Sequence, residues 1–366
     1  MNATWHSAQI YYYDTSHDDV SLDAVRPTLR ALSEHIDAAY VLPHWRQGPH
    51  LRVNVRCHPD AWTEHIQPEI ATRIGAHLAE HPSTAVLDPR ALREHALLAR
   101  LEHENGPLTP YIDDNTITFQ PHDPRLHIFG TLESSHLHAD FHADATDLVW
   151  RIQDEVRAGR IDRFATALDL MWTTSHIGFP PIQRSAASFY SHSLAFIANS
   201  PDPAVRAREY ATRYTANKHV LAARLHTVLT TLDDPCTTPD PLIRDWAALL
   251  RDYKDRATEL LRAGHLPIND RDLPRPTTPI VPTPLLSELA ADRHMQRFRD
   301  TVDYQRYRLL LNYTYGLLTR LRVKPIERGL LCHLAAATVQ DAFDIDIAAR
   351  FRDFIAHPHP LEGSHP

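Results

Sequence analysis

The chain has 366 residues, of which 43% are hydrophobic and 23% are charged, and its formal net charge is -8 at pH 7. This acidic balance argues against a protein that binds duplex nucleic acid, because such proteins carry a strong basic excess. None of the apolar stretches reaches the roughly 18 residues that a membrane-spanning helix needs, so no such helix is expected.

The N-terminal part of the chain is predicted to mix strands and helices. The expected elements are, in order, a strand at 7–14, a helix at 21–37, strands at 38–45 and 48–56, and a helix at 59–81. Pro68 is expected to interrupt or end the first part of the second helix. The order β-α-β-β-α indicates a split βαβ arrangement on a small sheet. Residues 101–125 are polar and rich in turn-forming residues, which predicts a surface loop.

From residue 144 onward the periodicity of apolar residues is helical, and Pro, Gly, Asp or Ser bounds each predicted helix. Residues 267–284 are rich in proline and are expected to form an extended connector. Two more helices are predicted after it, at 285–321 and 325–343.

The predicted fold class is therefore α+β, with the split βαβ-type sheet first and a mostly helical C-terminal half after it. We expect a mixed α/β region at 1–143, a helical region at 144–356 and a flexible tail at 357–366.

The three cysteines, Cys57, Cys236 and Cys332, are far apart and odd in number. They suggest neither a disulfide framework nor a CxxC site, which indicates a reducing cytoplasm. The N-terminus also lacks the charged and apolar pattern of a signal peptide. Cys57 and Cys332 lie in apolar stretches, so we interpret them as small core residues.

Common cofactor-binding and catalytic motifs are missing. The sequence has no GxxxxGK[ST], GxGxxG, GxSxG or HExxH, so phosphate loops, nucleophile elbows and zincin sites have no support. His136, His138 and His142 have the spacing of a possible zinc triplet. Such clusters arise by chance in a chain with 26 histidines, so we expect no metal and no cofactor.

One predicted strand, GPHLRVNVR at 48–56, stands out because its two faces differ. Alternate side chains of a strand point to opposite sides, so one face is apolar. The other face carries His50, Arg52, Asn54 and Arg56. Guanidinium groups suit the planar recognition of carboxylates, which makes this face a candidate for binding a substrate.

Several segments resemble a known family. WHSAQIYYYD at 5–14, a helix containing AVRPTLRAL, and the strand ending in GPHLRVNVR resemble the stand-alone C-terminal region of lantibiotic dehydratases and its thiopeptide relatives. The resemblance returns at 188–196 and at 307–336. In its best-known form this region eliminates glutamate from glutamylated Ser and Thr to leave dehydroamino acids.

Two departures from the eliminating enzymes indicate a different chemistry. Those enzymes have H-x-R-x-R in the strand, whereas here Asn54 stands at the second arginine. Asn54 cannot supply a charge for a departing carboxylate. Those enzymes also carry a motif shaped like H-M-H-x-N-R-L in a late helix, and the comparable LLLNYTYGLL has no histidine.

The branch of the family that this sequence resembles is the pyridine synthase of thiopeptide biosynthesis. The resemblance implies a formal [4+2] aza-cycloaddition between two dehydroalanines of a leader-bearing, azole-containing precursor peptide. The macrocycle closes, and water and the leader peptide are lost, without any cofactor. The implied partner is that peptide, with other modification enzymes as further candidates.

Such a reaction needs positioned groups rather than a strong nucleophile. Holding two alkenes together contributes about 7–11 kcal/mol, and both departures need proton donors. The catalytic candidates are His192, Tyr304, Tyr307, Ser287 and Tyr190. The candidates for substrate binding are Arg52, Asn54, Arg56, Ser188, Glu102, Glu104, Arg308, Asn312 and Tyr315.

Most of these candidates also have a structural interpretation. His192 would be a buried histidine with satisfied hydrogen bonds, and the stripe from Tyr304 to Tyr315 would be an ordinary core stripe. Ser287 is equally suited to cap a helix or to line a pocket. Glu102 and Glu104 would be solvated loop charges.

Two other functions stay open. The first is a glutamate-eliminating lyase that uses other residues, as part of a split lantibiotic-type dehydratase. The second is a non-catalytic protein that binds the modified peptide and presents it to other enzymes. The missing arginine and histidine argue against the lyase.

Overall fold

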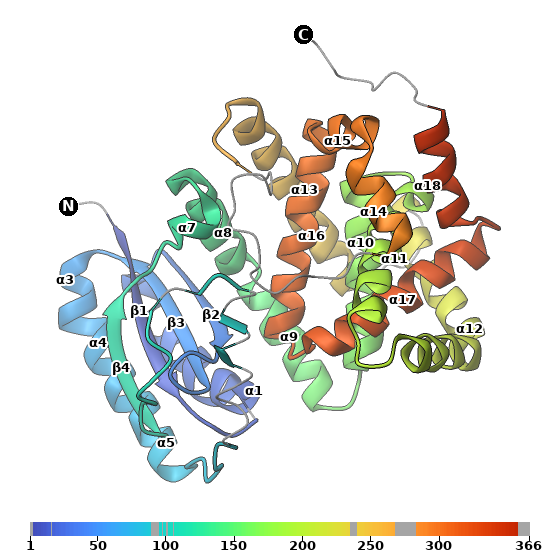
Figure 1. Cartoon of the computed structure of the whole chain (residues 1–366). Helices are drawn as coiled ribbons and strands as arrows, with labels where there is room; N and C mark the ends of the chain where they lie inside the picture. The colour runs from blue at the N-terminus through green and yellow to red at the C-terminus, as the bar shows by residue number, and fades with distance from the viewer. Residues whose placement is uncertain are drawn as a thin grey trace. The chain divides into compact units, whose positions relative to one another are not determined.

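The computed structural model describes residues 3–15, 17–88, 95–96, 98–99, 102–104, 106–234, 240–267 and 283–357 (Figure 1). Most of the predicted connector at 267–284 and nearly all of the predicted tail at 357–366 lie outside these residues. The described residues group into two compact units, one ending at Arg160 and the other beginning at Ile161.

The first unit is built on one antiparallel sheet. Its strands are β1 (Thr4–Tyr11), β2 (Ala38–His44), β3 (His50–Cys57) and β4 (Thr116–Pro121), in the order β2-β3-β1-β4. Every neighbouring pair is antiparallel. The predicted split βαβ arrangement and the α+β class are thereby confirmed.

The prediction of a loop throughout 101–125 was wrong, because β4 lies inside that segment. The sequence TITF alternates β-branched and aromatic residues as a strand does, but its polar flanks obscured this short pattern. Ile117 pairs with Ile10 of β1, so the apolar positions of β4 continue the apolar face of the sheet.

Two helical segments cover the apolar face of the sheet. The first comprises α1 (His17–Asp19), the π-helical η1 (Val20–Val25), α2 (Arg26–Ala31) and the 3-10 turn η2 (Ser33–His35). The second comprises α3 (Pro59–Ala61), η3 (Trp62–Ile66), α4 (Gln67–Glu69), η4 (Ile70–Ile74) and α5 (Gly75–Glu80), with π turns at η3 and η4.

Pro68 interrupts the regular α-helix of the second helical segment, as predicted, but it does not end the segment. It lies in α4, between the two π turns, and the Gln67 amide donates to the Trp62 carbonyl five residues earlier. The wider π turns lessen the clash of a proline ring with the preceding turn, so the helix continues through this residue.

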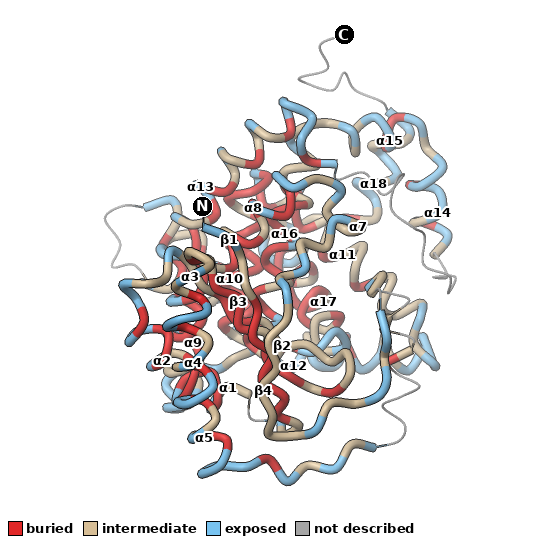
Figure 2. Tube along the Cα trace, turned by 90° about the vertical axis from the view of Figure 1, so that its left-hand side faces the viewer, coloured by how far each residue is buried: buried red, intermediate tan, exposed pale blue. Residues whose placement is uncertain are grey.

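The core of the first unit lies between the sheet and these helices. Val53 and Val55 of β3 are fully buried, as are Ile66 and Ile70 of the second helical segment. The buried residues of β1 and β3 are red in Figure 2. Because the apolar side chains lie on this face, the polar side chains of β3 must lie on the other.

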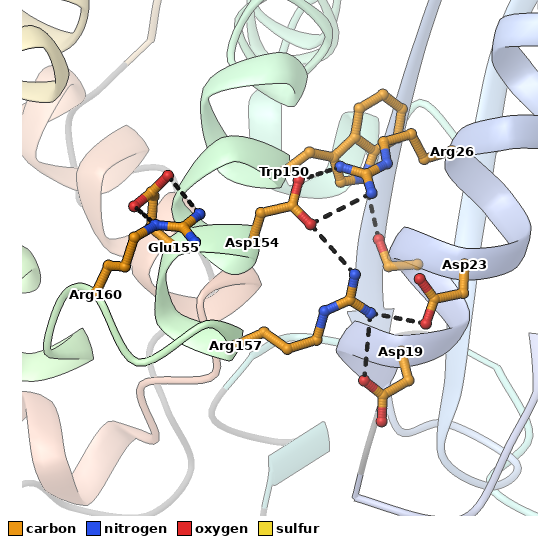
Figure 3. Close-up of polar contacts among 9 residues, drawn as sticks. Asp19, Asp23, Arg26, Trp150, Asp154, Glu155, Arg157 and Arg160 are labelled. Atoms are coloured by element: carbon orange, nitrogen blue, oxygen red, sulfur yellow. Dashed lines mark hydrogen bonds and ion pairs between the residues drawn. The ribbon is translucent and has the colours of Figure 1, made fainter.

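Three further helices complete the first unit: α7 (Leu126–Phe129), α8 (Leu132–Asp144) and α9 (Thr146–Arg157). The Trp150 indole N–H of α9 donates to Ser21 Oγ at 3.1 Å, and Arg26 pairs with Asp154 (Figure 3). These contacts hold α9 to the first helical segment. The unit therefore ends at Arg160, whereas composition and periodicity placed the division after residue 143.

The second unit is helical. Its helices are α10 (Arg163–Gly178), α11 (Ile182–Ala198), α12 (Pro203–Asp233), α13 (Pro241–Arg262), α14 (Pro284–Ala291), α15 (Arg293–Arg299), α16 (Val302–Arg320), α17 (Pro325–Ala342) and α18 (Ile347–Ala356). α10 is buried along most of its length and contacts α11, α12, α13, α16 and α17. None of the helices described here or in the first unit is long and apolar enough to cross a membrane.

The single helix predicted at 285–321 is three helices, α14, α15 and α16. Asp292 ends α14 and caps α15 by accepting from the Met295 amide, and Thr301 caps α16 by accepting from the Tyr304 amide. Such caps outweigh a continuous apolar period, because they satisfy amides that a helix start leaves unpaired. α18 was not predicted.

Candidate functional site

The polar face of the sheet carries three of the predicted substrate-binding residues, Arg52, Asn54 and Arg56. Arg52 lies opposite Gln9 of β1 and Leu42 of β2, and Asn54 lies opposite Ser7 and Tyr40. Asn54 is only 4% exposed. The strand pairing thus sets a buried amide, rather than a second guanidinium, in the middle of this face.

Arg52 is held by two histidines. Its Nε donates to His50 Nε2 at 3.4 Å, and one of its terminal nitrogens lies 3.2 Å from His44 Nδ1. Burial lowers the pKa of Arg52 to about 10, so the guanidinium stays charged at neutral pH. Burial also lowers the pKa of His50 to about 2 and that of His44 to about 4, so both imidazoles are neutral.

The two glutamates of the predicted acidic loop lie in different environments. Glu104 has a side chain that is 4% exposed, and its Oε1 lies 2.7 Å from Arg125 and 3.4 Å from His44 Nε2. Burial raises the pKa of Glu104, but the nearby His44 ring and the charge of Arg125 outweigh it and lower the pKa to about 2. Glu104 is therefore a buried anion, not a solvated charge.

Glu102, in contrast, is exposed, and its Oε2 accepts a hydrogen bond from the Trp45 indole at 3.0 Å. Arg56 pairs with Asp140 of α8 at 2.8 Å and lies 5.3 Å from the centre of the Trp5 ring. The sequence analysis did not single out His44, Arg125 or Asp140. Their positions depend on contacts between distant segments, which no local pattern displays.

The second unit brings His192 of α11 and Tyr315 of α16 together. His192 Nδ1 lies 2.6 Å from the Tyr315 hydroxyl oxygen, and the two rings are 5.3 Å apart. Burial, with smaller contributions from Arg328 and Arg308, lowers the pKa of His192 to about 4. Burial raises the pKa of Tyr315 well above its usual value. Both groups are therefore neutral at neutral pH.

The tautomer of His192 follows from this contact. An imidazole nitrogen is a stronger acceptor than a thiol sulfur, and within the described part of the chain the Tyr315 hydroxyl also lies 3.5 Å from Cys332 Sγ. The Tyr315 proton is therefore donated to His192 Nδ1, which leaves the second proton of the ring on Nε2. This arrangement makes Nε2–H a neutral donor in a fixed direction.

α17 completes this part of the site with two residues that the sequence analysis did not list as candidates for it. The Arg328 guanidinium lies 4.8 Å from the centre of the Tyr315 ring. Cys332 is fully buried, and burial raises the pKa of its thiol to about 11, so the thiol keeps its proton. Cys332 thus behaves as the small core residue that we expected.

Tyr307 has its hydroxyl fully engaged in the core. It donates to the Ser185 carbonyl at 2.9 Å and lies 2.9 Å from Ser175 Oγ. Burial raises the pKa of Tyr307, although hydrogen bonds to Ser175 and Ser188 lower it by a smaller amount. This geometry favours a structural role for Tyr307, and it places Ser188 beside it.

The other candidates of the second unit lie apart from this pair or at the surface. Tyr190 packs against the cluster formed by α14, α15 and α18. The Tyr304 ring, partly buried, is 5.1 Å from Phe298. Ser287 and Asn312 are exposed, whereas Arg308 is partly buried and near enough to His192 for its charge to lower the pKa of that imidazole. Thr283, not Ser287, caps α14, so the capping interpretation of Ser287 was wrong for this helix.

The described residues contain no group of three or more His, Cys, Asp or Glu side chains arranged to hold a metal ion. In α8, the His138 ring packs 4.5 Å from Phe129 and 4.4 Å from His142. These histidines are thus packed among rings rather than converging on a common point.

The fold and these residues place the chain in a known family. Residues 5–339 match the family described as lantibiotic biosynthesis dehydratase C-term, and the chain belongs to it. A comparison with curated proteins finds no match.

Among solved structures, the chain is similar to the pyridine synthase TbtD from thiomuracin biosynthesis. The two are 31% identical with a TM-score of 0.78, over 93% of this chain and 99% of that one. TsrL is 21% identical with a TM-score of 0.73, over 98% of this chain and 100% of its own. The tRNA-dependent lantibiotic dehydratase MibB from Microbispora sp. 107891 is 14% identical with a TM-score of 0.53, over 93% of this chain and 28% of its own. These last two likenesses concern the fold alone.

Proposed function

We propose that the chain is a pyridine-forming enzyme of thiopeptide biosynthesis. The substrate is an azole-containing precursor peptide with two dehydroalanines, and the reaction is a formal [4+2] aza-cycloaddition that closes the macrocycle. The observation that carries this proposal is the 31% identity to a pyridine synthase over 93% of the chain. Asn54, in place of the second arginine of the eliminating enzymes, supports it.

The neutral pair of His192 and Tyr315 suits the steps that follow ring closure. Loss of water and of the leader amide each need a proton donor, and no strong nucleophile is required. His192 Nε2–H can donate a hydrogen bond to the departing oxygen or nitrogen while water supplies the proton, and Tyr315 holds the imidazole in the tautomer that presents it. We assign to His192 a hydrogen bond from Nε2–H to the departing group, which takes up its proton from water, and to Tyr315 the positioning of the His192 ring.

On the sheet, Arg52 and Asn54 suit the binding of an uncharged peptide. Arg52 stays charged but is flanked by His44 and His50, and Asn54 contributes amide donors and acceptors without charge. Such groups orient peptide carbonyls and amides. The reaction needs no electron transfer, so we propose that it proceeds without a cofactor in the cytoplasm.

The test is to incubate the protein with a dehydrated, azole-containing precursor peptide and to follow the masses. Loss of water together with the leader fragment supports the proposal. Release of glutamate from a glutamylated peptide would instead identify a lyase. Tight binding without any change in mass would identify a non-catalytic binding protein.

A further inference from the structure

Arg328 lies on the side of α17 that borders the pair of His192 and Tyr315. Its guanidinium lies 4.8 Å from the centre of the Tyr315 ring, and its charge is near enough to His192 to lower the pKa of that imidazole. Cys332, one helical turn further along α17, lies 3.5 Å from the Tyr315 hydroxyl. These two residues of α17 therefore share the face that borders the pair.

Close packing against α11 fixes α17 at this point. A Cβ atom at Gly329 would lie 2.7 Å from Phe196 Cγ, so α17 approaches α11 as closely as a glycine allows. Figure 1 shows α17 beside α11. The backbone amide of Arg328 also donates to the Lys324 carbonyl at 2.9 Å. The root of the Arg328 side chain is therefore fixed relative to α11, which carries His192.

Within the part of the chain that the structure describes, the Arg328 guanidinium has no carboxylate partner and no hydrogen-bond acceptor. The adjacent carboxylate, Glu327, accepts from the Lys324 amide at 2.7 Å and belongs to the capping box of α17. Several other partly buried arginines of the second unit do pair with a carboxylate, namely Arg206, Arg224, Arg256 and Arg306. Arg328 differs from them because its five N–H donors are left for water or for a ligand.

The proposed reaction creates an oxygen that suits these donors. To act as the azadiene, one amide of the precursor peptide passes to its iminol form: its N–H proton leaves to water, and its oxygen takes a proton from water. Between the two transfers the negative charge lies mainly on the oxygen. A guanidinium stabilises such a charge through hydrogen bonds and keeps all of its own protons.

We propose that Arg328 is a catalytic residue that donates hydrogen bonds to the oxygen of the reacting amide as this amide passes to its iminol form. The inference rests on the proposed function, which supplies the peptide and the reaction. The Tyr315 ring holds the guanidinium beside His192. His192 acts later, when the same oxygen departs as water after ring closure. Arg328 and His192 thus serve one oxygen at two successive steps.

The test compares the single-turnover rate of Arg328→Ala with that of the wild type on the dehydrated, azole-containing precursor peptide. Arg328→Ala should lower the rate about 10²–10³-fold, the loss typical of removing a donor to a developing oxyanion. Guanidinium chloride, at concentrations too low to unfold the protein, should restore part of this rate, because the free ion occupies the space that the side chain leaves. Sodium chloride at the same concentration should not.

Arg256→Ala is the matched control. Arg256 is also partly buried and lies 4.5 Å from the centre of a tyrosine ring, that of Tyr253, but it belongs to α13 and pairs with Asp252 at 3.8 Å. The control should keep the full rate and should not respond to guanidinium. Arg328→Lys keeps the charge but loses the planar group, so its rate should lie between those of Arg328→Ala and the wild type, at an unchanged free energy of unfolding in urea.

The outcomes separate this proposal from the proposed function. If the wild type converts the precursor and Arg328→Ala reacts as fast as Arg256→Ala, Arg328 is not catalytic and the proposed function stands. A lowered rate that guanidinium does not restore would assign Arg328 to the support of the Tyr315 ring, which also overturns the proposal.

If Arg328→Ala does not fold, Arg328→Lys decides: a lowered rate at unchanged stability supports the proposal, and an unchanged rate overturns it. If the wild type leaves the mass of the precursor unchanged, the proposed function fails and the role of Arg328 fails with it.

Discussion

At the scale of single residues, a neutral imidazole is the main chemical feature of the second unit. His192 lies in a partly buried position where Tyr315 fixes one ring nitrogen and two nearby arginines oppose a positive charge. A neutral N–H donor is weaker than an imidazolium, but it stays in the same protonation state across the pH range of a cell.

His192→Ala should lower kcat about 10²–10³-fold while leaving leader affinity intact, because it removes a hydrogen-bond donor to the departing group and not a contact with the leader. The measurement is single-turnover mass spectrometry of the precursor, with the fluorescence anisotropy of a labelled leader peptide beside it. His219→Ala, an exposed histidine of α12, is the control and should keep the full rate. A full rate in His192→Ala would mean that the catalytic group lies elsewhere.

Glu104→Gln should destabilise the first unit by about 1–3 kcal/mol, because it leaves Arg125 without its buried carboxylate partner and removes a negative charge that favours the charged form of Arg52. Urea unfolding measures this change. Glu102→Gln is the matched control: this neighbouring glutamate is exposed, and its loss should change stability by less than about 0.5 kcal/mol. Equal effects would show that Glu104 is not the buried anion described above.

At the scale of elements, the caps decide where the candidate residues sit. Thr301 starts α16, which carries Tyr304, Tyr307 and Tyr315. Without that cap the Tyr304 amide, in the first turn of α16, has no side-chain acceptor. The later turns of α16 remain packed on α10 and α13.

Thr301→Ala should therefore cost about 1 kcal/mol of unfolding free energy. Thr215→Ala, in the exposed middle of α12, removes a hydroxyl that bonds only within its own helix and should cost less than about 0.5 kcal/mol. Both are measured by urea unfolding. A loss for Thr301→Ala no larger than that for Thr215→Ala would contradict the assignment of the cap.

Periodicity predicted the strands at β1, β2 and β3 and most of the helices, because apolar residues recur along these elements with the period of a strand or a helix. It failed where a competing local feature decided the outcome. β4 was hidden by polar neighbours, Asp292 and Thr301 divided an apolar run, and π turns carried a helix through Pro68.

The site was less predictable than the fold. His192 and Tyr315 were each singled out, but their hydrogen bond joins residues 123 positions apart and follows from helix packing. The buried state of Glu104 depends on Arg125 and His44 in the same way. Single-residue patterns identify side chains with suitable chemistry, whereas their environment comes from long-range contacts.

At the scale of the whole molecule, buried histidines make stability depend on pH. The folded pKa values of His44 and His192 are lowered to about 4, and that of His50 to about 2, from an unfolded value of 6.5. Above pH 6.5 these groups are neutral in both states and have no effect. Below it the unfolded chain binds protons that the folded chain does not, so stability is lost as the pH falls.

The free energy of unfolding should therefore fall by about 1–3 kcal/mol per buried histidine between pH 6.5 and pH 4. Glu104 adds to the loss below pH 4.5, because its folded pKa of about 2 lies below its unfolded value. Urea unfolding at several pH values measures the slope, and His192→Gln should reduce it. A free energy that stays constant from pH 6.5 to pH 4 would contradict the buried neutral state of these side chains.

The hydrogen bond between Tyr315 and His192 also bears on chemical labelling. Acylating reagents such as diethyl pyrocarbonate attack the imidazole nitrogen that carries the lone pair, and in His192 that nitrogen is Nδ1, which the Tyr315 hydroxyl covers. The contact that orients the ring thus also protects it from electrophiles, among them the reactive alkenes of a dehydrated peptide.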